Sequence, residues 1–160
     1  MAFLYVLALP GPEDVLKVGI SRQPLARWAS FHRRWFQAFD LDRSMLVETE
    51  TRAEAQAMET RLHRRLSEHQ CPIPMTIRVN AGGFTEWYRG ASLIVDNFVL
   101  ERGKEGYTVH PQARAWLAPQ MKEMSESLHG MAAFAYEQHL ADRLDPDALD
   151  RLRALVEAQW

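Results

Sequence analysis

The feature that most constrains the fold is a pair of apolar segments close to the N-terminus, separated by a short turn. Residues 3–9 read FLYVLAL, a continuous apolar run typical of a strand buried on both faces. Residues 10–12, Pro-Gly-Pro, end that strand, because proline cannot donate to a strand ladder and glycine permits a tight bend. Residues 15–20, VLKVGI, form the second segment. The sequence therefore predicts two strands joined by a turn.

One charged residue, Lys17, interrupts the second of these strands. Side chains alternate between the two faces of a strand, so Leu16 and Val18 share one face. Lys17 lies on the other face, together with Gly19. We therefore expect the Lys17 side chain to point away from the apolar side of the strand.

Capping patterns predict two helices. Ser21 can cap a helix that begins near Pro24, since proline is favoured in the first helical turn. Thr51 and Glu54 have the spacing of a capping box, which predicts a helix over residues 52–69. Both helices carry polar residues that bear on function.

The second helix places a glutamate beside its buried stripe, which is formed by Ala55, Met58, Leu62 and Leu66. At about 100° per residue, Arg52 lies about 20° and His63 about 40° from Glu59 around the helix. Glu59 is therefore at the edge of the stripe. A half-buried carboxylate requires a partner, because an unpaired buried charge is costly.

The remaining elements are shorter, apart from a helical C-terminal region. We expect strands at residues 44–48 and 84–88 and a helix at 92–102. The glycine-bounded segment 103–106 marks a boundary, which predicts a domain of residues 1–102 and a helical extension of residues 107–160. Within the extension, a Met-rich helical region over residues 112–143 precedes a last helix that starts at Asp145-Pro146. The apolar stripe of the region over residues 112–143 contains Met121, Met124, Met131 and Phe134.

Composition excludes several classes of protein. With 160 residues and 47% hydrophobic residues, the chain can bury a sizeable core. The single cysteine, Cys71, excludes an internal disulfide and a CxxC zinc site. No apolar run approaches the roughly 20 residues that span a bilayer, and the N-terminus lacks the pattern of a signal peptide. We therefore expect a cytoplasmic protein that does not enter a membrane.

The formal net charge of −2 conceals a basic segment. Residues 15–39 contain no acidic residue and five basic ones: Lys17, Arg22, Arg27, Arg33 and Arg34. Such a patch suits a polyanion, and we predict that Arg22, Arg33 and Arg34 contact DNA. A solvated basic face is the alternative from charge alone.

The polar residues of these segments match the needs of phosphodiester hydrolysis, which requires charge neutralisation and an activated water. Glu59 could hold one Mg²⁺ or Mn²⁺ ion, with waters and phosphate oxygens completing the shell. Arg27 and Lys17 would neutralise the phosphate. Tyr5, with either His32 or His63, could position or deprotonate the water. Each residue taken alone also fits a structural role; it is their order and spacing that favours a site.

That order resembles the GIY-YIG nuclease superfamily, in the branch of phages and mobile elements where lysine opens the second signature. The resemblance covers about residues 2–100 and rests on Phe3-Leu4-Tyr5, Lys17-Val18-Gly19, Arg27, Glu59 with His63, and Glu86-Trp87-Tyr88. Phe3 stands where the family has glycine, and a late asparagine of the family has no secure counterpart. The resemblance implies an α+β fold with a small three-stranded antiparallel sheet flanked by helices. It also implies one catalytic metal on Glu59.

Three functions compete at this point. The first is a metal-dependent endonuclease acting on DNA. The second is a nucleic-acid-binding or regulatory module that kept this fold without turnover. The third is an interaction protein whose Met-rich C-terminal helices bind a partner or a second copy of the chain.

Overall fold

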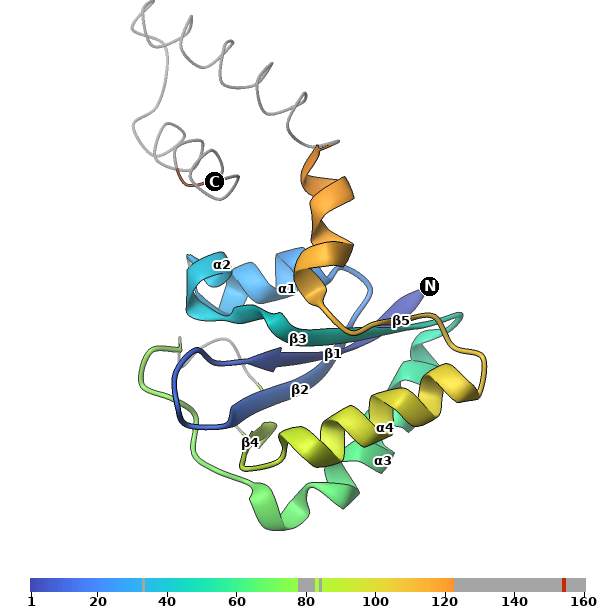
Figure 1. Ribbon diagram of the computed structural model, residues 1–160, viewed down its shortest axis with the longest axis horizontal. Coiled ribbons are helices and arrows are strands. Elements are labelled where there is room, and N and C mark those ends of the chain that lie inside the picture. The colour runs from blue at the N-terminus through green and yellow to red at the C-terminus, as the bar shows by residue number, and fades with distance from the viewer. Residues whose placement is uncertain (33, 78–82, 84, 123–153, 155–160) are drawn as a thin grey trace, which may run out of the picture. The chain divides into compact units, whose positions relative to one another are not determined.

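The two predicted N-terminal strands lie at the centre of a five-stranded antiparallel sheet (Figure 1). The structure, a computed structural model, describes residues 1–32, 34–77, 83, 85–122 and 154. The chain divides into two compact units, Met1–Arg114 and Ala115–Trp160. Of the second unit the structure describes residues 115–122, which are helical, and residue 154.

The sheet has the strand order β4-β2-β1-β3-β5. Its strands are β1 (Ala2–Ala8), β2 (Val15–Ser21), β3 (Asp40–Thr49), β4 (Trp87–Arg89) and β5 (Val109–His110). The α+β class is confirmed, but the expected sheet of three strands is wrong. The two additional strands, β4 and β5, hold three and two residues at the sheet edges. β4 overlaps the strand expected over residues 84–88, whereas β5 was not expected, because a strand of two residues leaves almost no periodic signal in a sequence.

Strand β2 extends past its edge partner. Register pairs join β4 only to residues 15–17 of β2, and the next contact is a hydrogen bond from the Val18 amide to the Glu86 carbonyl at 3.0 Å. From Gly19 to Ser21, β2 pairs with β1 alone among the described strands. The sheet is thus stepped at Gly19, and this step positions the functional site.

One face of the sheet is covered by α3 (Arg52–Arg65) and α4 (Ser92–Lys104), and we call it the α3/α4 face (Figure 1). Its core is mostly aliphatic and includes Leu4, Val6, Leu16, Val18, Val47, Met58, Leu62, Leu66, Val95 and Phe98. The predicted stripe of α3 is confirmed, since Ala55, Met58, Leu62 and Leu66 are all fully buried. Glu59 is buried beside it, with 6% of its surface exposed.

The opposite face, the α1/α2 face, is covered by α1 (Pro24–Phe31) and α2 (Trp35–Ala38) (Figure 1). It is rich in aromatic rings: Trp28 lies 6.3 Å from Tyr5 and 5.6 Å from Trp35, centroid to centroid. Lys17 points away from the α3/α4 core, as its place in the strand predicts. It is nevertheless fully buried, because rings cover this face as well.

Helix ends follow the predictions in part. The Thr51 side chain accepts a hydrogen bond from the Glu54 amide, which confirms the cap of α3. The helix ends at Arg65 and is followed by the 3-10 turn η1 (Ser67–His69), so it is shorter than predicted. Ser21 does not cap α1: the N-cap is Gln23, whose amide donates to the Ser21 hydroxyl within the preceding turn.

Most of the predicted C-terminal helices lie outside the described residues. This applies to residues 123–143, to the helix after Asp145-Pro146, and to the Met-rich stripe beyond Met121. The predicted boundary between residues 102 and 107 stays a prediction. Among the helices that the structure describes, none combines the length and the hydropathy needed to cross a membrane.

Candidate active-site pocket

A pocket of about 610 Å³ opens beside the step in the sheet. Several of its lining residues are polar or charged side chains from β1, the end of β2, α1, α3 and the segment before β4. The lining residues are Tyr5, Gly19, Ile20, Ser21, Arg22, Arg27, Arg52, Gln56, Glu59 and Glu86. Because β4 stops short of Gly19, residues attached to both faces of the sheet meet around this edge. The pocket combines two carboxylates with three guanidinium groups, a set suited to a metal ion and a phosphate.

Tyr5 reaches the pocket over a glycine. Its strand neighbour in the register is Gly19, and a Cβ atom at Gly19 would overlap the Tyr5 hydroxyl. Burial raises the pKa of the Tyr5 hydroxyl above its ordinary value, although a hydrogen bond and the nearby charge of Arg27 act in the opposite direction. Tyr5 is therefore protonated at neutral pH and serves as a hydrogen-bond donor.

Arg27 lies on α1, and contacts with other residues of that helix orient its guanidinium group. Its guanidinium lies 4.6 Å from the ring centroid of Phe31, one turn further along, and Nη1 donates to the Ser30 hydroxyl at 3.5 Å. Stacking on an aromatic ring fixes the plane of a guanidinium while leaving its N–H groups available. The bonded Tyr5 and Arg27 thus form a joint donor pair on one wall of the pocket.

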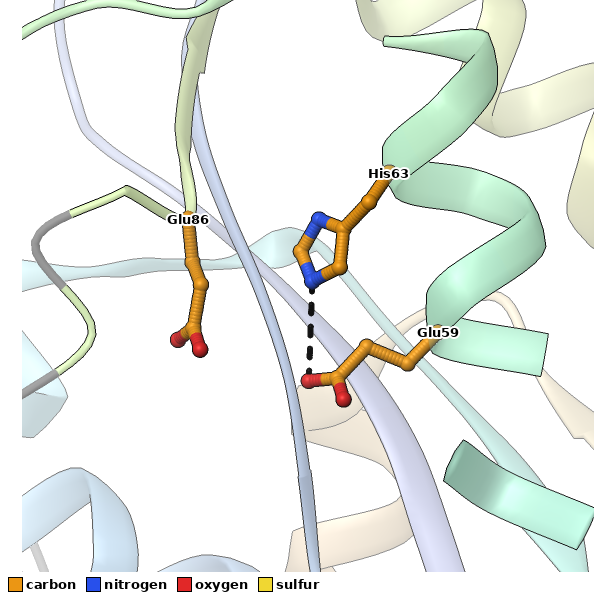
Figure 2. A group of neighbouring side chains, drawn as sticks. All are labelled: Glu59, His63 and Glu86. Carbon is orange, nitrogen blue, oxygen red and sulfur yellow. Dashed lines mark ion pairs between the residues drawn. The ribbon is translucent and has the colours of Figure 1, made fainter. Parts of the chain in front are cut away.

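Glu59 lies opposite, on α3. Its Oε2 accepts a hydrogen bond from Gln56 Nε2 at 2.6 Å, and its Oε1 lies 3.7 Å from His63 Nε2 (Figure 2). The i, i+3 and i, i+4 spacings place Gln56 and His63 on the same helix face. Glu59 is therefore oriented from both sides while its carboxylate faces the pocket.

His63 is oriented in turn by Tyr88 of β4. The His63 Nδ1 atom lies 2.5 Å from the Tyr88 hydroxyl, and that hydroxyl also lies 3.5 Å from the Thr85 carbonyl oxygen. Burial raises the pKa of Tyr88 to about 12, so its hydroxyl keeps its proton at neutral pH. His63 Nε2 is left facing Glu59.

Lys17 does not line the pocket; it bonds to a residue that does. Its ammonium donates to Glu86 Oε2 at 2.7 Å and lies 5.0 Å from the Phe31 ring centroid and 5.5 Å from that of Trp87. Burial lowers the pKa of Lys17, and the hydrogen bond and charge of Glu86 partly offset this. Gly83 borders the same ion pair: its φ is +74°, and a Cβ there would overlap both Lys17 Nζ and Glu86 Oε2.

The structure brings most of the predicted site residues together. Tyr5, Arg27 and Glu59 line one pocket with Arg22, and His63 and Lys17 contact its walls. His32 does not line that pocket: it ends α1, and its Nδ1 accepts a hydrogen bond from the Arg34 amide at 3.0 Å. Arg34 is exposed at the start of α2, and Arg33 lies outside the described residues.

Sequence reasoning missed three pocket residues as functional candidates: Glu86, Gln56 and Arg52. The helical angle had placed Arg52 near Glu59, so a signal existed for that residue. Gln56 follows from the same periodicity, three residues before Glu59. Glu86 had a signal in the Glu86-Trp87-Tyr88 triplet but lies just before β4, outside the regular elements, where no periodicity fixes the direction of a side chain.

The fold and the pocket define a small α+β domain with a metal- and phosphate-compatible site on one sheet edge. A family model, the T5orf172 domain, matches residues 2–102, and the chain belongs to this family. The T5orf172 domain is phage-associated and related to nuclease-type domains, which fits a nuclease-like or DNA-binding role. No curated protein and no solved structure gave a match to the chain.

Proposed function

We propose that this protein is a GIY-YIG-type endonuclease that hydrolyses DNA phosphodiester bonds with one divalent metal ion, Mg²⁺ or Mn²⁺. The observation that carries the proposal is the convergence of Tyr5, Arg27 and Glu59 on a single pocket. These residues come from β1, α1 and α3, and no local feature of the chain requires them to meet. The family match and the order of the signature residues support the same activity.

The metal would be held by Glu59. Its carboxylate is buried, faces the pocket and forms no ion pair with a lysine or arginine among the described residues, so a cation is the partner that its burial requires. When bound, the ion supplies charge neutralisation on the phosphate and lowers the pKa of a coordinated water. Gln56 fixes one carboxylate oxygen at 2.6 Å, which orients the other.

The remaining pocket residues would bind and orient the substrate. The Arg27 guanidinium donates to phosphate oxygens and stabilises the charge that develops on them. The Tyr5 hydroxyl, protonated at neutral pH, donates to a phosphate oxygen or positions the attacking water. Arg22 and Arg52 extend the basic wall toward the neighbouring DNA backbone. Lys17, which does not line the pocket, would act indirectly through its ion pair with Glu86.

The test is plasmid nicking in the presence of Mg²⁺ or Mn²⁺. Glu59→Gln and Arg27→Ala should each reduce the rate about 10² to 10³-fold. Matched controls are Glu68→Gln and Arg64→Ala, because both residues are exposed and lie outside the pocket lining. Controls that cut like the wild type, with both pocket variants inactive, are the expected result. Full cleavage by Glu59→Gln and Arg27→Ala would refute the proposed site.

A second candidate function is DNA binding without cleavage. It is favoured by the burial of Lys17, which leaves this signature residue away from the pocket. This candidate predicts salt-dependent binding to duplex DNA in an anisotropy titration, weakened by Arg22→Ala, with no nicking in either metal. Metal-dependent nicking by the wild type would exclude it.

A further inference from the structure

The carboxylate of Glu86 lies on the side of the pocket that faces Glu59 and His63. One ligand atom from each of Glu59, His63 and Glu86 lies within 4.8 Å of the other two (Figure 2). Glu59 and His63 come from α3, and Glu86 from the segment before β4, on the other side of β2. Figure 2 shows the three side chains directed toward a common space between these elements.

We propose that Glu59, His63 and Glu86 together form a three-ligand metal site that prefers a transition-metal ion such as Mn²⁺ to Mg²⁺. This inference deepens the proposed function and rests on it for the location of the metal. It adds two ligands to Glu59 and assigns a selectivity to the site.

Charge supports a cation at this position. Glu59 is nine-tenths buried, and its one ion-pair contact in the described part of the chain is His63 Nε2 at 3.7 Å, which is beyond hydrogen-bond distance. Glu86 has Lys17 as its ion-pair partner, whereas Glu59 has no lysine or arginine partner in the described part of the chain. A divalent ion between the carboxylates would satisfy Glu59 and leave the Lys17 contact intact.

The surroundings of His63 are those of a metal ligand. A ligating histidine usually donates its other ring N–H to a fixed acceptor, which sets the tautomer and the ring plane. Tyr88 can accept from His63 Nδ1 at 2.5 Å while its own proton is directed at the Thr85 carbonyl. In that arrangement the lone pair of His63 Nε2 is available on the side of Glu59.

The ligand types decide the selectivity. Mg²⁺ takes oxygen ligands and retains much of its water, whereas imidazole favours transition metals. Trans ligands in an octahedral shell of about 2.1 Å radius lie about 4.2 Å apart. Only one pair among three ligands can be trans, and cis ligands in the same shell lie about 3.0 Å apart. Atoms that lie within 4.8 Å of one another must therefore close by up to about 1.8 Å, which rotation of the two glutamate side chains can supply.

The test measures metal binding directly on the full chain, without DNA. Mn²⁺ is titrated at about pH 8, where free imidazole is neutral, and the unbound ion is followed by its EPR signal. Mg²⁺ affinity is obtained by competition. We expect Mn²⁺ to bind at least tenfold more tightly than Mg²⁺, and His63→Asn and Glu86→Gln to weaken Mn²⁺ binding by 10- to 100-fold. Tyr88→Phe should weaken it by a smaller factor.

His69→Ala is the matched control, since this histidine lies on η1 and contacts the Arg89 carbonyl instead. Circular dichroism confirms that each variant is folded. Wild-type affinity in both His63→Asn and Glu86→Gln, or equal affinities for the two ions, would overturn the three-ligand site. Should either variant unfold, Tyr88→Phe together with the Mn²⁺-to-Mg²⁺ ratio of the wild type decides the question.

The two proposals fail in different ways. If Glu59→Gln abolishes nicking while His63→Asn and Glu86→Gln bind Mn²⁺ normally, the endonuclease stands and the three-ligand site falls. If tight Mn²⁺ binding requires all three residues but no DNA is cut, the site stands and the endonuclease falls.

Discussion

The two faces of the sheet differ in chemistry although both are buried. The α3/α4 face joins aliphatic side chains such as Leu4, Val18 and Leu62 into one core. The α1/α2 face instead places Tyr5 and Lys17 beneath aromatic rings. The difference shows that burial alone does not tell whether a residue serves stability or the functional site. One face contributes stability, and the other fixes polar groups in a low-dielectric environment where their charges act strongly.

The largest effect expected from this contrast is on stability. Phe98→Ala removes a fully buried ring from α4 and should lower the free energy of unfolding by about 3–5 kcal/mol. Phe98 does not line the pocket, so nicking per folded molecule should be unchanged. Urea unfolding and plasmid nicking measure the two effects. A loss of nicking at full folding would show that the two faces are coupled.

A smaller effect is expected for the buried charge of the α1/α2 face. Lys17→Met keeps the volume but leaves Glu86 without its partner, which should cost about 2–3 kcal/mol of unfolding free energy, less than for a fully buried pair because Glu86 is 30% exposed. The double variant Lys17→Met/Glu86→Gln should recover part of this loss. A double-mutant cycle with no coupling would contradict the ion pair as a stabilising contact.

Gly19→Ala tests how closely the site depends on the β1–β2 contact. The added methyl group would meet the Tyr5 hydroxyl, so we expect a loss of about 1–2 kcal/mol in stability. Displacement of Tyr5 should also slow nicking about 10- to 100-fold. Gly103→Ala is the control, because a Cβ there would lie at an ordinary contact distance of 3.7 Å from Val109 and Gly103 is outside the pocket lining. Wild-type nicking by Gly19→Ala would mean that the position of Tyr5 is not critical.

The smallest effect concerns pH and comes from tyrosines on both faces: Tyr5 on the α1/α2 face, and Tyr88 and Tyr107 on the α3/α4 face, where a hydrogen bond to Glu54 raises the pKa of Tyr107. Burial raises the pKa of Tyr88 to about 12 and raises that of Tyr5 as well, whereas an unfolded tyrosine titrates near ~10. Above about pH 10 the unfolded chain loses protons that the folded chain keeps. The contribution of these tyrosines to stability should therefore be constant well below pH 10 and decline as the pH rises toward 12.

Urea midpoints measured between pH 9 and 11 check this decline. Tyr88→Phe should make it less steep, because it removes one of the three described tyrosines with a raised pKa, which are Tyr5, Tyr88 and Tyr107. An unchanged slope in Tyr88→Phe would assign the alkaline loss of stability to other groups.

Much of the fold could be predicted because its signals are local. The apolar runs of β1 and β2, the Thr51 cap and the stripe of α3 each follow from residues within a few positions of one another. The strand expected over residues 84–88 overlaps β4, whereas β5 was not predicted, since two residues carry no period and pair only with a distant partner. The aromatic cover over Lys17 was missed because strand alternation says nothing of what packs on the far face.

The candidate site shows the same contrast between residues placed by local signals and residues placed by distant contacts. Its members on regular elements, Tyr5, Arg27 and Glu59, could be selected from sequence because a strand or helix fixes their direction. Glu86 could not be selected in this way, since it lies outside the regular elements and its position depends on Lys17, which is 69 residues away in the chain. His32 illustrates the reverse error: a histidine near the predicted cluster in sequence lies outside the pocket lining because α1 ends there.

The Lys17–Glu86 ion pair joins positions 69 residues apart in the chain. During synthesis, a ribosome-bound fragment can display Tyr5, Arg27 and Glu59 well before Glu86 has emerged. Such a fragment lacks β4 and the wall of the pocket that precedes it, so the pocket is complete only once nearly the whole domain has been translated.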